Sequence, residues 1–496
     1  MTPTARILVI DAGTTGIRAL VYDENTTILA QAYTEFPQYH PGPDRVEQDG
    51  NEIWEATRAM LSKALDSAGL QASDLTAIGI TNQRATTVLW DTETGLPVTR
   101  AIVWQDTRTA DRAAELSAEW GTKVYGRTGW ALAPVYSSLS IEWMLDNVDG
   151  LRELAGAGRL AFGTVDSWLI YQLTGGAEHV ISASNASVTG SYDLTTDQWY
   201  TEWLDALGIP VSIYPEVRDD SGVLGHTAVE AIGARVPIAS SIADQHSALF
   251  AQGCIRPGMV KCTHGTGTFL DMTIGSTPVI DTASGLTSQI AWRIGGETVY
   301  ALEGYAGSAV QWLRDGAAII ADSAESEAVA GSVPDNGGVY FVPALTGLSA
   351  PYWDAYARGT IVGINPGTTR GHLVRATLEG IVFSVRDFID VMSAVSGHPI
   401  SQIAVDGGAS RNNLLLQFQA DQLDATVTRP KNTEATSLGA ALLAGLATGV
   451  WASPEEAVST VEIEATFTPR LSAEQREAEY ATWRRAVERS RGWLKK

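Results

Sequence analysis

Residues 7–23 read ILVIDAGTTGIRALVYD, with two short apolar runs on either side of a turn rich in glycine and threonine. Residues 7–10 and 19–22 have the length and apolar character of buried strands. In the turn, Gly13 and Gly16 allow a close approach of the backbone to a ligand. Backbone N–H groups and threonine hydroxyls in such a turn can surround phosphate oxygens. The stretch predicts a phosphate-binding hairpin, and an ordinary glycine-rich hairpin is the alternative.

Two charged residues flank this turn. Asp11 stands at the end of the first strand, where its carboxylate can hold a hydrated Mg²⁺ against phosphate oxygens. Arg18 can neutralise further phosphate charge. The pattern therefore favours a nucleotide with its metal ion over a neutral ligand.

Two later segments repeat the pattern of a strand that runs into glycines. Residues 263–268 read THGTGT between two apolar-leaning segments, and residues 403–410 read IAVDGGAS. Two phosphate turns near the starts of two halves suggest a duplicated fold that closes on one nucleotide. No Gly-Lys pair occurs in the chain, so a Walker P-loop is excluded.

The composition bounds the remaining possibilities. A chain of 496 residues is too long for a single core, and we place a domain boundary near residue 252, which gives domains 1–252 and 253–496. The net charge of −23 argues against nucleic acid and anionic membranes as partners. Two cysteines, no signal peptide and no long apolar run predict a cytoplasmic protein. The Ala- and Gly-rich residues 438–451 predict a buried helix.

Asp244 is the strongest candidate for a catalytic carboxylate. It follows the apolar strand 236–243 and begins a helix. Phosphoryl transfer to a hydroxyl needs a carboxylate that accepts the hydroxyl proton. An aspartate at a helix start is also a common capping residue, which is the structural alternative.

The order of these motifs resembles the actin-like ATPase superfamily, and within it the FGGY carbohydrate kinases, above all their glycerol kinase branch. The resemblance implies a two-domain, ribonuclease H-like α/β fold with a duplicated β-sheet core and an interdomain active-site cleft. It runs nearly end to end, through motifs at residues 79–84, 101–105, 163–168, 301–304, 311–315, 347–354 and 438–441.

The resemblance implies ATP as the phosphoryl donor, Mg²⁺ at Asp11 and Asp244 as the catalytic base. The family motif Gly-Asp-Gln-Gln stands here as Ala243-Asp-Gln-His246. Three aromatic residues, Trp104, Tyr136 and Phe269, are implied as walls of the acceptor site, although a single aromatic residue is more often part of the core than of a ligand site. The implied acceptor-binding residues are Arg84, Trp104, Tyr136, Asp244, Gln245 and Phe269, and the implied nucleotide-binding residues are Gly13, Thr14, Thr15, Arg18, Thr266, Gly267, Gly307, Gln311, Gly408 and Asn412.

The chain departs from the family pattern at four places. Ala85 stands where glycerol kinases have a glutamate, so a carboxylate that would accept a hydrogen bond from glycerol is missing, and we expect open space in its place. The other departures are Ser140 in place of a lysine, a segment 303–307 shorter by about three residues, and a reduced glycine-rich loop at 232–236.

Three functions remain open at this stage. The first is a kinase of glycerol or a closely related small polyol, and the second is a kinase of a larger polyol or ketose, such as a tetritol or pentulose. The third is an actin- or chaperone-like ATPase without a small-molecule acceptor. The sequence leaves open whether the chain forms a homo-oligomer.

Overall fold

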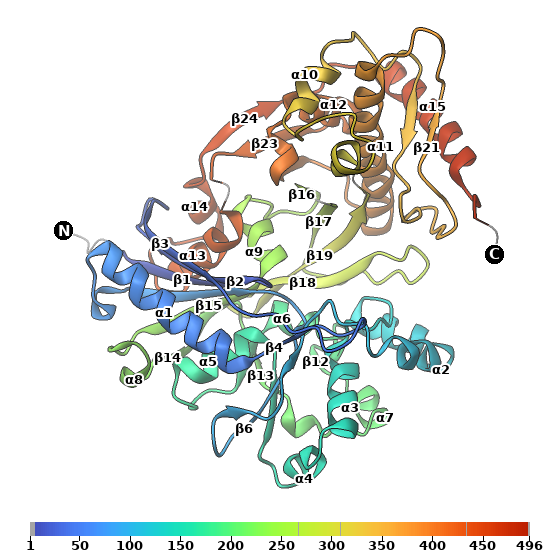
Figure 1. Cartoon of the computed structure of the whole chain (residues 1–496). Coiled ribbons are helices and arrows are strands. Elements are labelled where there is room, and N and C mark those ends of the chain that lie inside the picture. The colour runs from blue at the N-terminus through green and yellow to red at the C-terminus, as the bar shows by residue number, and fades with distance from the viewer. Residues whose placement is uncertain (1–4, 266, 308, 433, 495–496) are drawn as a thin grey trace.

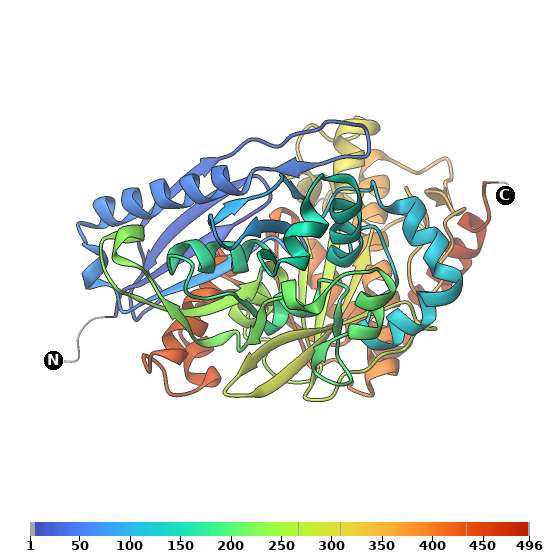
Figure 2. The same cartoon turned by 90° about the horizontal axis from the view of Figure 1, so that it is seen from below.

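A single mixed sheet of thirteen strands, counted over the described residues, runs through the molecule (Figure 1). This computed structural model describes residues 5–265, 267–307, 309–432 and 434–494. The strand order from edge to edge is β24-β23-β22-β16-β17-β19-β18-β14-β15-β5-β1-β2-β3. The two termini lie at opposite ends of the molecule in both views (Figures 1 and 2).

The sheet divides into strands from the two halves of the chain. The N-terminal half contributes β1 (Ile7–Ala12), β2 (Gly16–Tyr22), β3 (Ile28–Glu35), β5 (Ala77–Asn82), β14 (Ser221–His226) and β15 (Pro237–Ala243). The C-terminal half contributes β16 (Met259–His264), β17 (Thr268–Gly275), β18 (Thr287–Ile294), β19 (Glu297–Ala306), β22 (Gln402–Asp406), β23 (Thr426–Pro430) and β24 (Ile463–Phe467).

The two halves share one five-strand topology. In the first, β1 pairs antiparallel with β2 and parallel with β5, β2 pairs antiparallel with β3, and β5 pairs parallel with β15. In the second, β16, β17, β22, β19 and β23 repeat these pairings in the places of β1, β2, β5, β3 and β15. The predicted duplication of the β-sheet core is confirmed.

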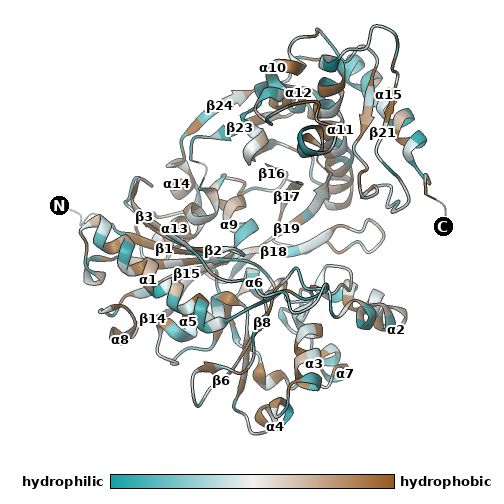
Figure 3. Ribbon diagram, viewed as in Figure 1, coloured by the Kyte–Doolittle hydropathy of each residue, from teal (hydrophilic) through white to brown (hydrophobic). Residues whose placement is uncertain are grey.

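Helices cover both faces of the N-terminal strands. Every residue of β1 and β5 is buried, as expected for strands with both faces covered. Helix α1 (Gly50–Ala68) packs on β2 and β3, whereas α13 (Ala435–Ala447) packs on β1, β5, β14 and β15. Hydrophobic residues predominate in strands β1 and β2 (Figure 3).

Helix α13 belongs to the C-terminal half in sequence but packs on the N-terminal half. A Cβ atom at Gly439 would lie 2.0 Å from the Ser247 carbonyl oxygen, and one at Gly79 would lie 2.8 Å from the Ala440 carbonyl oxygen. Glycine therefore permits the contacts of α13 with α9 (Asp244–Ala251) and with β5. The buried helix predicted around residues 438–451 is present, and no described helix is long and apolar enough to span a membrane.

Smaller elements complete the two halves. The N-terminal half adds β4 (Glu47–Gln48), β6 (Val88–Asp91), β7 (Leu96–Pro97), β8 (Ala101–Ile102), α2 (Ala110–Thr128), α3 (Ser137–Asn147), α4 (Leu151–Gly156), β9 (Leu160–Gly163), α5 (Val165–Leu173), β10 (Val180–Ser182), α6 (Ala183–Ser187), β11 (Tyr192–Asp193), β12 (Gln198–Trp199), α7 (Thr201–Ala206), β13 (Glu216–Arg218) and α8 (Val229–Ile232). The C-terminal half adds α10 (Glu325–Ala330), β20 (Tyr340–Val342), β21 (Thr360–Val362), α11 (Arg370–Ser396), α12 (Asn413–Leu423), α14 (Pro454–Ser459) and α15 (Ala473–Ser490).

Candidate active site

The predicted first phosphate turn joins β1 and β2. The Gly13 N–H donates to the Gly16 carbonyl at 3.0 Å and closes the turn. A Cβ atom at Gly16 would lie 2.4 Å from the Thr34 carbonyl oxygen, so close packing against β3 requires this glycine. Neither glycine has a positive φ. The turn therefore depends on the small size of Gly16, and the left-handed conformation that glycine also permits is not used.

Asp11 ends β1 beside this turn, as predicted. Its side chain is nearly buried, and burial raises its pKa to about 6 against the opposing charge of Arg18, whose Nε lies 3.6 Å from Asp11 Oδ2. Arg18 also forms an ion pair with Glu434, just before α13. These residues, with Gly13 and Thr15, line a cavity of about 490 Å³. The turn thus lines a space with a carboxylate and a guanidinium at its edge.

Thr14 is fixed by residues from elsewhere in the N-terminal half. Its carbonyl accepts hydrogen bonds from the side-chain amides of Gln38 at 2.7 Å and Gln48 at 2.8 Å. Its hydroxyl accepts a bond from the Trp104 indole N–H at 3.0 Å. Trp104 is 42% exposed. The structure therefore brings Trp104, predicted to contact the acceptor, against the first turn.

The predicted second turn joins β16 and β17 and is also closed by a hydrogen bond between two glycines. The Gly265 N–H donates to the Gly267 carbonyl at 2.8 Å. A Cβ atom at Gly267 would lie 2.2 Å from Cε2 of Tyr305. His264, before the turn, is buried, and its Nε2 lies 2.8 Å from the Gln419 Oε1 atom. Thr266, predicted to contact the nucleotide, lies outside the described residues.

Two parallel strands place Asp244 near Arg84. Strands β15 and β5 are paired in parallel with Ala243 opposite Asn82, so the residues that follow each strand end lie at one edge of the sheet. Arg84 Nε lies 3.5 Å from Asp244 Oδ1. Burial raises the pKa of Asp244, and Arg84 opposes that shift. The helix N-cap is Ala243, although Asp244 Oδ1 does accept a bond from the Gln245 N–H at 2.7 Å.

Arg84 also connects the two halves of the chain. Its Nη1 and Nη2 donate to the two carboxylate oxygens of Glu303 on β19, at 2.5 and 3.0 Å, and Nη1 donates to Gln289 Oε1 on β18 at 3.0 Å. Although burial alone raises the pKa of Glu303, Arg84 outweighs it, so the net shift is downward. A bidentate pair of this kind fixes the guanidinium plane.

A buried ion pair lies in the same region. Lys261 on β16 is opposite Asp271 on β17, and its Nζ lies 2.8 Å from Asp271 Oδ2. Lys261 also donates to Gln245 Oε1 at 2.5 Å. Burial alone lowers the pKa of Lys261, but the charges of Asp271, Asp406 and Glu303 outweigh it and raise this pKa. Gln245, predicted to bind the acceptor, is thus linked to the C-terminal half.

The three predicted aromatic walls differ in their surroundings. Phe269 is 36% exposed and packs against Tyr305 with ring centroids 5.1 Å apart. Tyr136 is fully buried, is stacked on Trp130, and its hydroxyl donates to the Trp130 carbonyl at 2.6 Å. The structure therefore gives Tyr136 the role of a core residue, because its ring and hydroxyl are both already engaged.

The predicted adenosine residues are divided between two places. Gly307 and Gln311 line a cavity of about 670 Å³ with Trp312 and the segment 343–349. Gly408, by contrast, begins a short 3₁₀ helix whose neighbours line a separate cavity of about 510 Å³. Asn412 is buried, caps α12 and donates to Ser326 Oγ at 3.1 Å. The structure therefore does not bring these four residues to one cavity, and it gives Asn412 a structural role.

Ala85 does not open the space that its small side chain suggests. It is 3% exposed and has φ of 60°, a left-handed conformation. Its carbonyl accepts a hydrogen bond from the Ser137 hydroxyl at 3.0 Å. The carboxylate that does lie next to Arg84 belongs to Glu303, from the C-terminal half.

Sequence reasoning did not single out His246, Lys261, Asp271, Gln289 or Glu303 as functional residues, although three of them carried a signal. Lys261 and Asp271 are charged residues within otherwise apolar strands, and His246 replaces the last glutamine of a motif that was already identified. Charged residues are almost never fully buried unless paired, so both strand positions could have been tested as an ion pair.

The duplicated sheet, its two glycine turns and the carboxylate at the end of β15 define a sugar or polyol kinase of the actin-like fold. The N-terminal domain of the FGGY family of carbohydrate kinases matches residues 6–251, and the C-terminal domain of that family matches residues 260–448. The chain belongs to this family and is an ATP-dependent carbohydrate kinase.

Relatives of known name cover nearly the whole chain. Glycerol kinase 2 of Thermotoga maritima is 48% identical over 99% of both chains, and glycerol kinase of Trichlorobacter lovleyi is 50% identical over 98% of this chain and 99% of its own. The crystal structure of Plasmodium falciparum glycerol kinase with ADP superposes with a TM-score of 0.93 at 32% identity, over 98% of each chain. A protein-binding ATPase without a small-molecule acceptor does not agree with this membership.

Proposed function

We propose that this kinase transfers the γ-phosphoryl group of ATP to a hydroxyl of glycerol or a closely related small polyol. The observation that carries the proposal is the position of Asp244, at the end of β15 and 3.5 Å from Arg84. Identity of 48–50% to two glycerol kinases over almost the full length supports the acceptor class.

Asp244 acts as the general base in this proposal. Its carboxylate accepts the proton of the acceptor hydroxyl as the oxygen forms its bond to the γ-phosphorus and the bond to the β–γ bridging oxygen breaks. Burial raises the pKa of Asp244, which strengthens it as a base, and the Arg84 guanidinium limits that rise by favouring the charged carboxylate.

Arg84 and Gln245 orient the acceptor. Both are held by the C-terminal half, Arg84 by Glu303 and Gln245 by Lys261. Such fixed donors select one hydroxyl for reaction, because correct orientation supplies a large part of the rate enhancement. Trp104 and Phe269 are both partly exposed and are available to cover the C–H bonds of a polyol.

The first turn holds the phosphates and their metal ion. Asp11 fits a hydrated Mg²⁺, because it offers hard carboxylate oxygens whose burial makes an uncompensated charge costly. When bound, Mg²⁺ neutralises charge that develops on the phosphate oxygens. Arg18 and the N–H groups of Thr14 and Thr15 bind those oxygens, since the Gly13 N–H already closes the turn, and Gly267 and Gln311 complete the nucleotide site from the C-terminal half.

Removal of the Asp244 carboxylate tests the proposal. We expect Asp244→Asn to lower kcat by roughly 10² to 10⁴ while the protein still binds ATP, since general-base catalysis contributes about this factor. Asp111→Asn, at an exposed position in α2, is the matched control. ADP release is measured with a panel of polyols and ketoses, and more than about a tenth of wild-type activity in Asp244→Asn would exclude the role.

We also propose that domains 1–252 and 253–496 hinge and close around the nucleotide. The two turns stand in different halves, and closure would exclude water from the transferred phosphoryl group. Small-angle scattering should show a smaller radius of gyration with acceptor and a non-hydrolysable ATP analogue than with either alone. An unchanged radius would contradict closure.

A further inference from the structure

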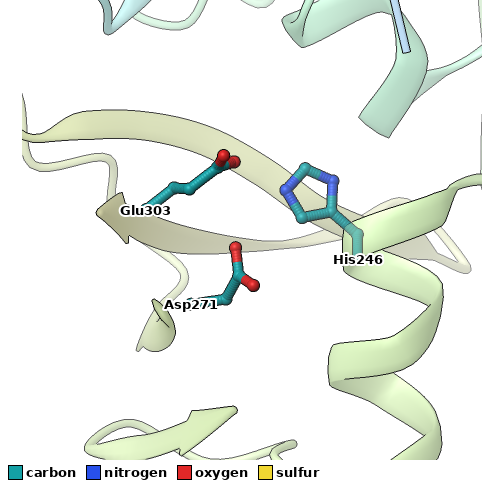
Figure 4. A group of neighbouring side chains, drawn as sticks. All are labelled: His246, Asp271 and Glu303. Carbon is teal, nitrogen blue, oxygen red and sulfur yellow. The ribbon is translucent and has the colours of Figure 1, made fainter. Parts of the chain in front are cut away.

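Three polar side chains from both halves of the chain point toward one another near Asp244 (Figure 4). His246 comes from α9, and Asp271 and Glu303 stand directly opposite each other on β17 and β19. One nitrogen or oxygen atom from each lies within 4.8 Å of the others. His246 and Asp271 are fully buried. The group lies where the N-terminal helix α9 meets the C-terminal sheet.

Part of the hydrogen-bonding capacity of this group is unused. Neither ring nitrogen of His246 has a hydrogen-bond partner among the described residues, and Asp271 Oδ1 has none there either. Buried polar atoms without partners are rare and costly, so each needs a physical explanation. Three such atoms beside a candidate catalytic residue indicate a polar ligand that forms the missing hydrogen bonds.

A metal ion explains this group less well than a neutral ligand does. Lys261 Nζ lies 2.8 Å from Asp271 Oδ2, and Arg84 donates to both oxygens of Glu303. Both carboxylates therefore already have a positive partner. A divalent cation would stand close to two buried positive charges, a repulsion that low dielectric strengthens.

The imidazole of His246 has the chemistry to bind a hydroxyl group. Burial, with Arg84 nearby, lowers the pKa of His246 to about 3, so the ring is neutral at physiological pH. A neutral imidazole offers one N–H donor and one nitrogen acceptor. A hydroxyl can accept from the first while it donates to Asp271 Oδ1.

This position is separate from the reacting hydroxyl. Asp244 contacts Arg84, Arg84 contacts Glu303, and Glu303 lies next to His246. Resting on the proposed function, we infer that His246, with Asp271, binds a hydroxyl remote from the one that is phosphorylated. Within the proposed class of acceptors, this position favours polyols or ketoses of at least four carbons over glycerol, because Arg84 and Gln245 already serve the hydroxyls of a three-carbon acceptor.

The test compares acceptors of different length on matched variants. We measure kcat/KM for glycerol, erythritol and D-xylulose with wild type, His246→Leu, His246→Gln and His179→Gln. His179, a half-buried histidine that contacts the Phe162 carbonyl at 2.7 Å, serves as the control. Thermal melting of each variant verifies its fold.

We expect wild type to have a higher kcat/KM for erythritol or D-xylulose than for glycerol. His246→Leu should lower kcat/KM for the preferred longer acceptor by about 10- to 100-fold, mainly through KM, because it leaves a buried hydroxyl unpaired. Its effect on glycerol should stay within about threefold, since a three-carbon acceptor does not reach this group. His246→Gln, which keeps a donor and an acceptor, should restore part of the loss.

Three results would overturn the inference. The first is a wild type that prefers glycerol over both longer acceptors. The second is a kcat/KM that His246→Leu lowers equally for all acceptors, or for none. If that variant does not fold, the same comparison is made with His246→Gln. The third is a melting temperature that Zn²⁺ or Mn²⁺ raises in wild type but not in His246→Gln, which would assign a metal site. Failure of every acceptor, or an active Asp244→Asn, would instead refute the proposed function.

Discussion

The two glycine turns are each closed by a hydrogen bond between glycines, and they have different surroundings. In each, the N–H of the first glycine donates to the carbonyl of the last, and in each the last glycine has no room for a Cβ atom. Two residues before the first turn stands Asp11, whereas Thr263 holds that place before the second. Both halves therefore have a closed glycine turn, and only the first has a carboxylate at the place where we propose that a metal ion binds.

The strands that lead into these turns differ as well. Strand β1 is apolar up to Asp11, but β16 carries the buried Lys261. The apolar side chains of β1 only pack in the core. Lys261 on β16, by contrast, pairs with Asp271 and donates to Gln245 of the other half. The C-terminal strands thus supply the charges that lie near the end of β15. The following predictions test this difference between the two halves.

The largest expected effect follows from removal of Lys261. In Lys261→Met the Asp271 carboxylate stays buried without its cation, and we expect a loss of about 3–5 kcal/mol in the free energy of unfolding, measured in urea. Lys261→Met combined with Asp271→Leu should recover most of the loss, because no unpaired charge remains. Equal stability of the single variant and wild type would show that the pair is not needed.

Asp11 should show itself in the pH dependence of stability. Its pKa is about 6 in the folded chain against 3.8 for a free carboxyl, so the folded state binds more protons between these values and stability falls as pH rises. Without nucleotide and metal, Asp11→Asn should therefore become more stable than wild type as pH rises from 4 to 7, by roughly 3 kcal/mol at the upper end.

His264 beside the second turn should change stability with pH in the opposite direction. Burial lowers the pKa of His264, so the folded state binds fewer protons and loses stability as pH falls toward that pKa. His264→Gln should remove this loss, while Asp11→Asn removes the loss of stability that accompanies a rise in pH from 4 to 7. Denaturation curves at several pH values check both, and the same pH slope in both variants would contradict the assignment.

The smallest effect distinguishes the two final glycines. Gly16→Ala places a methyl group against the rigid Thr34 carbonyl, and we expect a loss of about 1–3 kcal/mol in unfolding free energy. Gly267→Ala meets only the ring of Tyr305, which is 43% exposed and free to turn, so the loss should be smaller. A larger loss in Gly267→Ala would show that the Tyr305 ring is held in place.

Sequence patterns captured most of the fold because they are local. The strand, turn and strand of residues 7–23, the buried helix near residue 440 and the position of Asp244 each depend on neighbours along the chain. The family membership and the duplicated fold are confirmed. The assignment of individual binding residues stays a prediction.

The rest depends on contacts between distant residues, which no local pattern contains. Glu303 on β19 contacts Arg84, which follows β5, although the two residues are more than two hundred positions apart in the sequence. Tyr136 is different, because Trp130, which engages its ring and hydroxyl, lies only six positions before it, and its role at the acceptor stays a prediction. Ala85 suggested an open space, yet the surrounding chain buries it.

The packing of α13 on the N-terminal strands has a consequence for synthesis on the ribosome. Strands β1, β5 and β15 are complete once residue 243 has been made, but the helix that covers one of their faces begins at residue 435. Because synthesis adds about 5–20 residues per second, that apolar face stays exposed for on the order of ten seconds or more before α13 is made. A newly made N-terminal half is thus a natural client for a chaperone, and the two halves expressed as separate chains should each be prone to aggregate.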